Sequence, residues 1–307
     1  MFRYIVRRLL QGVLTFFGAT FIVFLLMFAG SGDPIQALAG EKPVSAAQRV
    51  ALTQQFHLDD NIFVRYFYFL RDLFSGDLKS YTGRLVFEEL GYKFGLTARV
   101  ALIAILFTII VGVTAGIIAA LRRGGIFDSS TLILTLIVIG IPSIVLAPLA
   151  QYLFGIKWGI FPVIYTPDKP VSSLILPGLV LGALSLATAL RLTRASFFDN
   201  LRADYVRTAT SKGLKRTRVV GVHVLRNSLI PIVTFLGVEL GNLMGGAIVT
   251  EGVFNIPGIG GTLYKAINLE DGPTVVTLVS LLVIVYIAAN LIIDVLYAVL
   301  DPRIRYE

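Results

Sequence analysis

Six long apolar runs, separated by polar segments, dominate the pattern of this chain. A hydrocarbon core of about 30 Å needs about 20 apolar residues per helical span, and each run is long enough to cross it. The pattern therefore predicts an all-α polytopic membrane protein with six transmembrane helices, over residues 9–30, 97–121, 129–154, 172–190, 229–253 and 274–300.

The first run follows a basic flank of Arg3, Arg7 and Arg8 and so resembles a secretory signal. It is longer than the apolar core of a typical signal peptide and lacks a small-residue cleavage site. We therefore expect an uncleaved first helix with its basic flank in the cytoplasm.

The number of positive charges indicates on which side of the membrane each of the other connections between the predicted helices lies. The inner connections hold Arg122 and Arg123, nine Lys and Arg residues over 191–228, and the closing Arg303 and Arg305. The outer connections, 155–171 and 254–273, hold only Lys157, Lys169 and Lys265. The positive-inside rule then places both termini and residues 191–228 in the cytoplasm, with the chain in the bacterial cytoplasmic (inner) membrane.

The long segment 31–96 is expected outside and to have structure of its own. Ser45 with Gln48 predicts a capping box. Apolar residues at 63, 66, 67, 70 and 74 repeat at helical spacing around the polar Arg65 and Asp72. Two interpretations are open, a helix lying on the outer membrane surface or one packed on the helical bundle.

Small residues and prolines are concentrated inside the apolar runs. Gly112 and Gly116 are four residues apart, as are Gly237, Gly241 and Gly245, so each series predicts a face for close helix packing. Prolines at 142, 148 and 177 remove helix hydrogen bonds and predict bends.

Composition excludes several classes of chemistry. There is no cysteine, so disulfides, thiolate ligands and thiol nucleophiles are absent. The two histidines, His57 and His223, are far apart, and we expect no metal site. Membrane topology explains the net charge of +8, so we expect no nucleic-acid binding. The chain contains no G-x-x-x-x-G-K-[ST] sequence, and so no phosphate-binding loop of that kind.

The segment from Asp204 to Lys212 has the start and stop signals of a short cytoplasmic helix. Gly213 is placed to end it in the left-handed conformation. Tyr205, Thr208 and Ala209 are three and four residues apart, which predicts a small face able to enter a groove on a partner. The alternative is a solvated basic loop that only enforces topology.

Carboxylates in or at the ends of the spans are candidate pathway residues, because an ionised group there is costly unless paired or hydrated. Glu239 with Asn242 three residues away either lines a cavity or pairs between helices. Glu251 is expected near the outer mouth, and Asp294 has Asn290 one turn away. A proton-coupled secondary transporter would use these groups as its relay, and a sensor or scaffold is a third class.

The cytoplasmic segment resembles the coupling loop of binding-protein-dependent ABC importers, whose motif runs Glu-Ala-Ala, then glycine, then Ile-x-Leu-Pro. Here Arg207-Thr208-Ala209 occupies the place of Glu-Ala-Ala, with arginine instead of the acidic residue. Gly213 matches the glycine, and Ser228 to Pro231 match the closing element. The sequence Asp204 to Ala209 is similar to the first permease subunit of dipeptide, oligopeptide and nickel importers. Further similar elements lie at 32–34, 76–78, 191–196, 253–260 and 296–303.

This resemblance implies the fold of a type I ABC importer permease, as one domain over 1–307. Its parts are a first helix (1–30), an extracytoplasmic loop (31–96) and a five-helix core (97–307) that includes the coupling loop 191–228. It implies a non-catalytic permease subunit for dipeptides or oligopeptides, with nickel, glutathione or another small solute as alternatives.

The implied partners are a homologous second permease, two cytosolic ATPases and an extracytoplasmic binding protein. ATP and Mg are used by the ATPases, and this chain is expected to bind no cofactor. The implied coupling residues are Asp204, Tyr205, Arg207, Thr208, Ala209 and Gly213.

Overall fold

The computed structural model describes residues 2–28, 35, 44–80, 83–88, 90–269 and 271–300. Over these residues the secondary structure is helical apart from one isolated bridge between Lys79 and Leu85, which confirms the all-α class. The motif at 32–34, the end of the motif at 296–303 and the side chain of Asp294 lie outside the described part.

The chain forms two compact units, residues 1–97 with 255–307, and residues 98–254. The boundary falls inside one helix and at the end of another. The description as a single permease domain stays a prediction.

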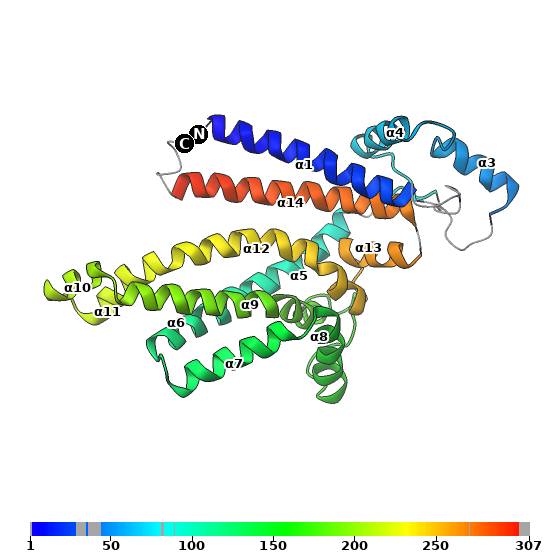
Figure 1. The fold of residues 1–307 in the computed structure, drawn as a ribbon. Helices are drawn as coiled ribbons and strands as arrows, with labels where there is room; N and C mark the ends of the chain where they lie inside the picture. Colours follow the sequence, from blue (N-terminus) through cyan, green and yellow to red (C-terminus); the bar gives the residue numbers. More distant parts are fainter. Residues whose placement is uncertain are drawn as a thin grey trace. The chain divides into compact units, whose positions relative to one another are not determined.

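Among the residues that the structure describes, the first unit holds five helices and the start of a sixth. They are α1 (Phe2–Phe28), α3 (Ala46–Gln55), α4 (Ile62–Ser75), the first residues of α5 (Leu90–Phe107), α13 (Ile259–Asn268) and α14 (Gly272–Leu300). Helices α1 and α14 run side by side, as Figure 1 shows. Gly12 permits this approach, because a Cβ there would lie 2.8 Å from Ile287.

The segment after α1 folds as its local signals predict. Ser45 and Gln48 make the reciprocal capping box of α3, and Asn61 caps α4 through a hydrogen bond from the Phe63 N–H to its side chain (3.0 Å). Helix α4 ends at Gly76 with φ of 81°. Local sequence therefore sets the bounds of both helices.

The predicted apolar face of α4 is divided between packing and exposure. Tyr66 stacks edge-on against Phe21 and Phe24 of α1, and its hydroxyl lies 2.7 Å from that of Thr20. Phe63 stacks on Phe21 and Phe74 lies against Phe16, yet large aromatic side chains beside Tyr66 remain 66–69% exposed, namely Phe63, Phe67 and Phe74. The structure thus shows packing on α1, while a membrane-surface position for the exposed face stays a prediction.

The second unit is built around α9 (Figure 1). Its first helical segment continues from α5 through the π-helical η1 (Thr108–Val113) into α6 (Thr114–Leu121). The others are α7 (Ile126–Gly140), α8 (Ser143–Ala150), η2 (Gln151–Lys157), α9 (Ser172–Leu201), α10 (Asp204–Ser211), α11 (Arg216–Arg218), η3 (Val219–Val224) and α12 (Leu225–Val253).

Within the described residues, five helices are long and apolar enough to cross a membrane. A sixth span requires α7 with the segment 143–157, and these are bent by 107°. The predicted span over 129–154 is therefore a pair of helices with a sharp bend between them. The break lies at Pro142, as predicted for a residue that lacks the N–H needed to continue a helix.

The predicted cytoplasmic segment 191–228 is also less loop-like than expected. Helix α9 continues past 190 to Leu201, and α12 begins at Leu225 rather than 229. The apolar span thus extends into the polar segment without a helix break, because charged and polar side chains do not themselves end a helix.

Glycines fix how closely α9 packs against α5, η1 and α6. A Cβ at Gly112 would lie 3.1 Å from the Leu186 carbonyl oxygen, and one at Gly116 would lie 2.7 Å from that of Leu190. This confirms the first predicted glycine face. On α9 itself, a Cβ at Gly182 would lie 2.7 Å from the Ala104 carbonyl oxygen.

The second predicted glycine face holds only in part. Gly241 is buried, but a Cβ at Gly245 would have no neighbour within 4 Å. Spacing alone could not show which turns of α12 have a helix beside them.

These two glycines provide a matched test. Gly182→Ala pushes Cβ onto backbone atoms that cannot rotate away, so we expect a loss of about 1–3 kcal/mol in unfolding free energy. Gly245→Ala meets open space and removes glycine from a helix interior, so we expect unchanged or slightly higher stability. Thermal unfolding of the two purified variants measures the difference, and equal midpoints would contradict the close packing.

Candidate functional site

The candidate site is the junction between the end of α9 and the start of α10, which we call the α10 junction. Arg202 ends α9, and Ala203 takes an extended conformation (φ −68°, ψ 149°) that starts α10 at Asp204. Helix α10 ends at Ser211, and Gly213 has φ of 77°, the left-handed conformation expected of it. The predicted bounds of this helix are confirmed to within one residue.

Helix α10 has two distinct faces. The inner face holds Tyr205 and Val206, both half-buried, and Ala209, which is 8% exposed. The exposed residues Asp204, Arg207, Thr208 and Ser211 follow the i, i+3, i+4, i+7 spacing of one helical face.

The predicted docking face of Tyr205, Thr208 and Ala209 is therefore divided. Only Thr208 points away from the chain, because Ala209 is covered by its own unit and Tyr205 is half-covered. Any surface that α10 offers to a partner is centred on Arg207 and Thr208, with Asp204 and Ser211 beside them.

A path of hydrogen bonds leads from α10 through α9 to α12. The Tyr205 hydroxyl donates to Asn200 Oδ1 (2.6 Å), and Asn200 Nδ2 donates to the Ser196 carbonyl (2.8 Å). The Ser196 hydroxyl then donates to the carbonyl of Ser228 in α12 (3.0 Å). Ser228 is 1% exposed and itself donates to the Val224 carbonyl (2.8 Å). A displacement of α10 therefore acts on two long helices at once.

Apolar packing supports the same junction. Ala120, Phe197 and Val224 form a buried cluster against which Val206 of α10 packs. The neighbouring Phe198 ring has a guanidinium on it from each of two residues, Arg123 at 3.5 Å and Arg202 at 4.2 Å. Such cation–π contacts hold two basic side chains at the junction.

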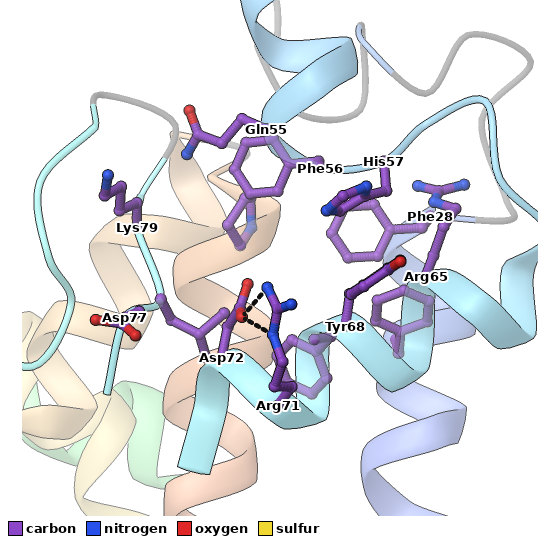
Figure 2. Close-up of a pocket in the computed structure, with 14 residues that line it drawn as sticks. Phe28, Gln55, Phe56, His57, Arg65, Tyr68, Arg71, Asp72, Asp77 and Lys79 are labelled. Carbon is purple, nitrogen blue, oxygen red and sulfur yellow. Dashed lines mark hydrogen bonds and ion pairs between the residues drawn. The ribbon is translucent and has the colours of Figure 1, made fainter. Parts of the chain in front are cut away.

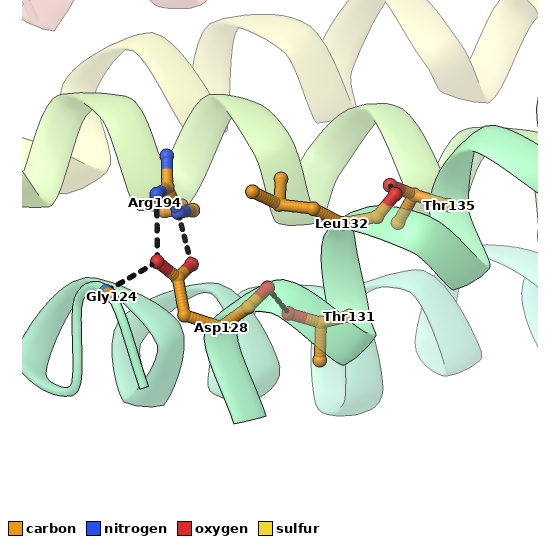
Figure 3. A network of polar contacts seen from close by, with 6 residues as sticks. All are labelled: Gly124, Asp128, Thr131, Leu132, Thr135 and Arg194. Carbon is orange, nitrogen blue, oxygen red and sulfur yellow. Dashed lines mark hydrogen bonds and ion pairs between the residues drawn. The ribbon is translucent and has the colours of Figure 1, made fainter. Parts of the chain in front are cut away.

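The start of α7 is bound to α9 by an ion pair, drawn in Figure 3. Asp128, only 2% exposed, accepts hydrogen bonds from Arg194 Nε and, at 2.8 Å, from Arg194 Nη2. The same carboxylate accepts from the Gly124 N–H (2.9 Å), so it also closes the turn between α6 and α7. This bidentate arrangement is the strongest form of an arginine–carboxylate pair.

The predicted pathway carboxylates take different positions. Glu239 accepts a hydrogen bond from Ser185 of α9 and one from Asn242 Nδ2 (3.2 Å), so it pairs between helices while staying half-buried. Glu251 is fully buried in the last turn of α12. The part of the chain that the structure describes brings no three His, Asp or Glu side chains together as a metal site.

Comparison with known proteins is informative over the whole length. Residues 112–306 match the model of the family described as binding-protein-dependent transport system inner membrane component, and residues 1–114 match that of the N-terminal part of such membrane components. This chain belongs to that family. The match at 112–306 includes α10 and both helices that hold it.

Relatives match from end to end. The chain is 33% identical to a dipeptide transport system permease protein of Alkalihalophilus pseudofirmus and 34% identical to that of Escherichia coli, in each case over the full length of both chains. It is 36% identical to a glutathione transport system permease protein of Escherichia coli, again over both full lengths. The chain is thus similar to multi-pass permease subunits of peptide importers of the ABC class.

Several residues of the junction were not predicted from sequence. Arg194 and Ser196 lie in the motif at 191–196, but nothing in the motif indicates their partners. Asp128 carries a weak signal, since a lone carboxylate at the start of an apolar run next to two arginines requires compensation. Asn200 carries none, because a polar residue near a helix end is ordinary, and Ser228 lies in the closing element of the motif, which does not indicate its partner.

We expect Asp128→Asn to destabilise the second unit by about 3 kcal/mol, because it leaves the Arg194 guanidinium without its counter-charge. Asp204→Asn is the matched control, since Asp204 is 97% exposed and its distance to Arg207 is 3.8 Å. Thermal unfolding in detergent measures both. A midpoint for Asp128→Asn equal to that of Asp204→Asn would show that the buried pair contributes nothing.

Proposed function

We propose that this chain is the non-catalytic permease subunit of an ATP-driven importer and that the exposed face of α10 docks on a cytosolic ATPase. The observation that carries the proposal is the division of α10. Its outer face is free of the chain, while its inner face is bound to α9 and α12 through Tyr205, Val206 and Ala209. A helix built only to enforce topology needs charge, but not this connection.

The same arrangement suggests how motion is transmitted. Alternating access is an equilibrium between two arrangements of the spans, and a partner shifts it by binding one arrangement more tightly. ATP binding between two ATPases would move α10 through Arg207 and Thr208. The bonds from Tyr205 to Asn200 and from Ser196 to Ser228 would carry that movement into α9 and α12.

Family membership implies a transport system with a binding protein. We propose the remaining composition as a homologous second permease, two ATPases that use ATP and Mg, and an extracytoplasmic binding protein that delivers the substrate. The absence of a G-x-x-x-x-G-K-[ST] sequence is consistent with energy supplied by a partner.

For the substrate we propose small peptides, dipeptides or oligopeptides. The relatives are named for dipeptide and glutathione transport, and both substrate classes contain amide bonds and free carboxylates. Nickel and other small solutes are the alternatives within the same machinery. Uptake of a labelled dipeptide panel by cells expressing the complete system tests this choice.

The orientation is open to a direct test, because the chain has no native cysteine. We expect Lys215→Cys to resist an impermeant thiol reagent in intact cells and to react after lysis, since positive charge holds its segment inside. Asp168→Cys, on an exposed outer connection, is the control and reacts in intact cells. Reaction of Lys215→Cys before lysis would show that the topology is the reverse of the one proposed.

Two variants separate the docking of the ATPase on α10 from the transmission of motion from α10 to α9 and α12. Thr208→Arg places a long charged side chain on the exposed face, so we expect it to abolish both uptake and ATPase co-purification. Tyr205→Phe removes one hydrogen bond behind that face, so we expect the ATPase to co-purify normally while uptake falls about three- to tenfold.

The control is Lys215→Gln, outside α10, which we expect to leave both measurements unchanged. If Thr208→Arg kept normal uptake and normal ATPase binding, α10 would not be the docking element. If Tyr205→Phe kept full uptake, the hydrogen-bond path would not transmit the motion.

A further inference from the structure

A cavity of about 330 Å³ lies within the first unit. Its walls come from the end of α1, residues 55–57, one face of α4, residues 77–79 and Pro273. Figure 2 shows side chains from these segments around it. We name it the Arg65 pocket.

Arg65 is the unusual group in this wall. It is only 8% exposed, and its buried Nε has no hydrogen-bond partner among the residues that the structure describes. Among the residues that the structure describes, no carboxylate lies within ion-pair distance of it, and its recorded contact is the Phe28 ring, 5.4 Å from the guanidinium carbon. Burial lowers the pKa of this guanidinium below its ordinary value. A buried cation without a counter-ion is costly and marks a site for an anion.

The other charged groups of the pocket leave this cation uncompensated. Arg71 pairs with Asp72 at 2.9 Å and lies over the Tyr68 ring, so that carboxylate is already engaged. Asp77 and Lys79 are both exposed and balance one another in charge. His57 stacks on Tyr68 with 4.0 Å between ring centroids.

The distribution of side chains around α4 indicates from which side an anion would reach the pocket. Arg65 and Tyr68 face the pocket, whereas the exposed aromatic residues Phe63, Phe67 and Phe74 are on the opposite side of the helix. If that aromatic side meets the bilayer, the pocket faces water. A dissolved anion then reaches it more readily than a lipid headgroup.

We propose that the Arg65 pocket binds a small peptide or acylated amino acid through its carboxylate, with the guanidinium of Arg65 as its partner. A guanidinium matches the two oxygens of a carboxylate with parallel hydrogen bonds. The half-buried rings of Phe56 and Tyr68 line the remaining space and accept an apolar side chain. The site is independent of ATPase docking, since binding requires neither ATP nor α10.

The first experiment isolates the carboxylate. The full-length chain, purified with its partner subunits in lipid nanodiscs without ATP or binding protein, is titrated with N-acetyl-phenylalanine and with its uncharged amide. We expect the acid to bind on the order of tenfold more tightly than the amide, because only the acid neutralises Arg65. Equal affinities, or no binding of the acid, would overturn the proposal.

Variants then assign the effect to Arg65. Arg65→Gln should remove the preference for the acid, and Arg65→Lys should retain part of it because the charge remains. Arg99→Gln is the matched control, an exposed arginine that does not line the pocket, and should bind like the unaltered chain. Unchanged preference in Arg65→Gln would exclude this residue as the anion partner.

A stability measurement separates binding from a structural role. Because Arg65 is buried without a counter-ion among the described residues, Arg65→Gln should raise the thermal midpoint in the absence of ligand. N-acetyl-phenylalanine should raise the midpoint of the unaltered chain but not that of Arg65→Gln. A lower midpoint for Arg65→Gln, with ligand stabilisation retained, would identify Arg65 as a structural residue only.

A lipid source is tested by repeating the titration in nanodiscs with and without anionic lipid. Binding of the acid that is unaffected by anionic lipid supports a site for dissolved carboxylates. Binding seen only after anionic lipid is removed would identify a lipid phosphate as the occupant and overturn the proposal.

Discussion

Close packing of α9 is the constraint on which the second unit depends. Helix α9 runs unbroken from Ser172 to Leu201, and glycines on both sides bring its backbone against its neighbours. Gly182 approaches Ala104, and Gly112 and Gly116 approach Leu186 and Leu190. In a bilayer, lipid tails are as apolar as leucine side chains, so close backbone contact rather than hydrophobic burial holds such helices together. A tightly held helix moves as one body, as the coupling proposed for α10 would require.

The polar groups of this unit follow from the same constraint. Because α9 is packed closely against its neighbours, a charged residue on a neighbouring helix can pair with a side chain of α9. Two such residues do so. Asp128 at the start of α7 pairs with Arg194, and Glu239 of α12 pairs with Ser185. Replacing a buried ion pair by apolar residues often costs nothing, but breaking it does. We infer that these pairs fix the register of α7 and α12 against α9 more than they add stability.

The first unit shows the contrary case. Among the described residues, buried Arg65 has the Phe28 ring beside it and no counter-charge, whereas Asp128 and Arg194 pair with one another. This difference in pairing bears on the role of Arg65. A buried charge that only stabilises the fold has an oppositely charged partner within the fold. The aromatic side chains Phe24, Phe69 and Tyr66 pack α4 on α1 beside this group.

The sequence alone determined those features that local interactions fix. The capping box at Ser45, the bounds of α10, the left-handed Gly213 and the break at Pro142 each depend on a few neighbouring residues. Apolar length determined the number of candidate spans, and the motifs around Asp204 and Arg191 determined the family.

Tertiary structure decided what depends on residues far apart in the chain. Periodicity showed that Thr208 and Ala209 are close on α10, but not that Ala209 faces inward, because the covering segment comes from another part of the chain. Asp128 lies 66 residues from Arg194, and Ser196 lies 32 residues from Ser228. From sequence, Arg65 is a polar residue beside an apolar face, and the packing shows it buried with no counter-charge among the described residues. Helical spacing specifies which side chains share a face, whereas the neighbour of that face depends on how the whole chain packs.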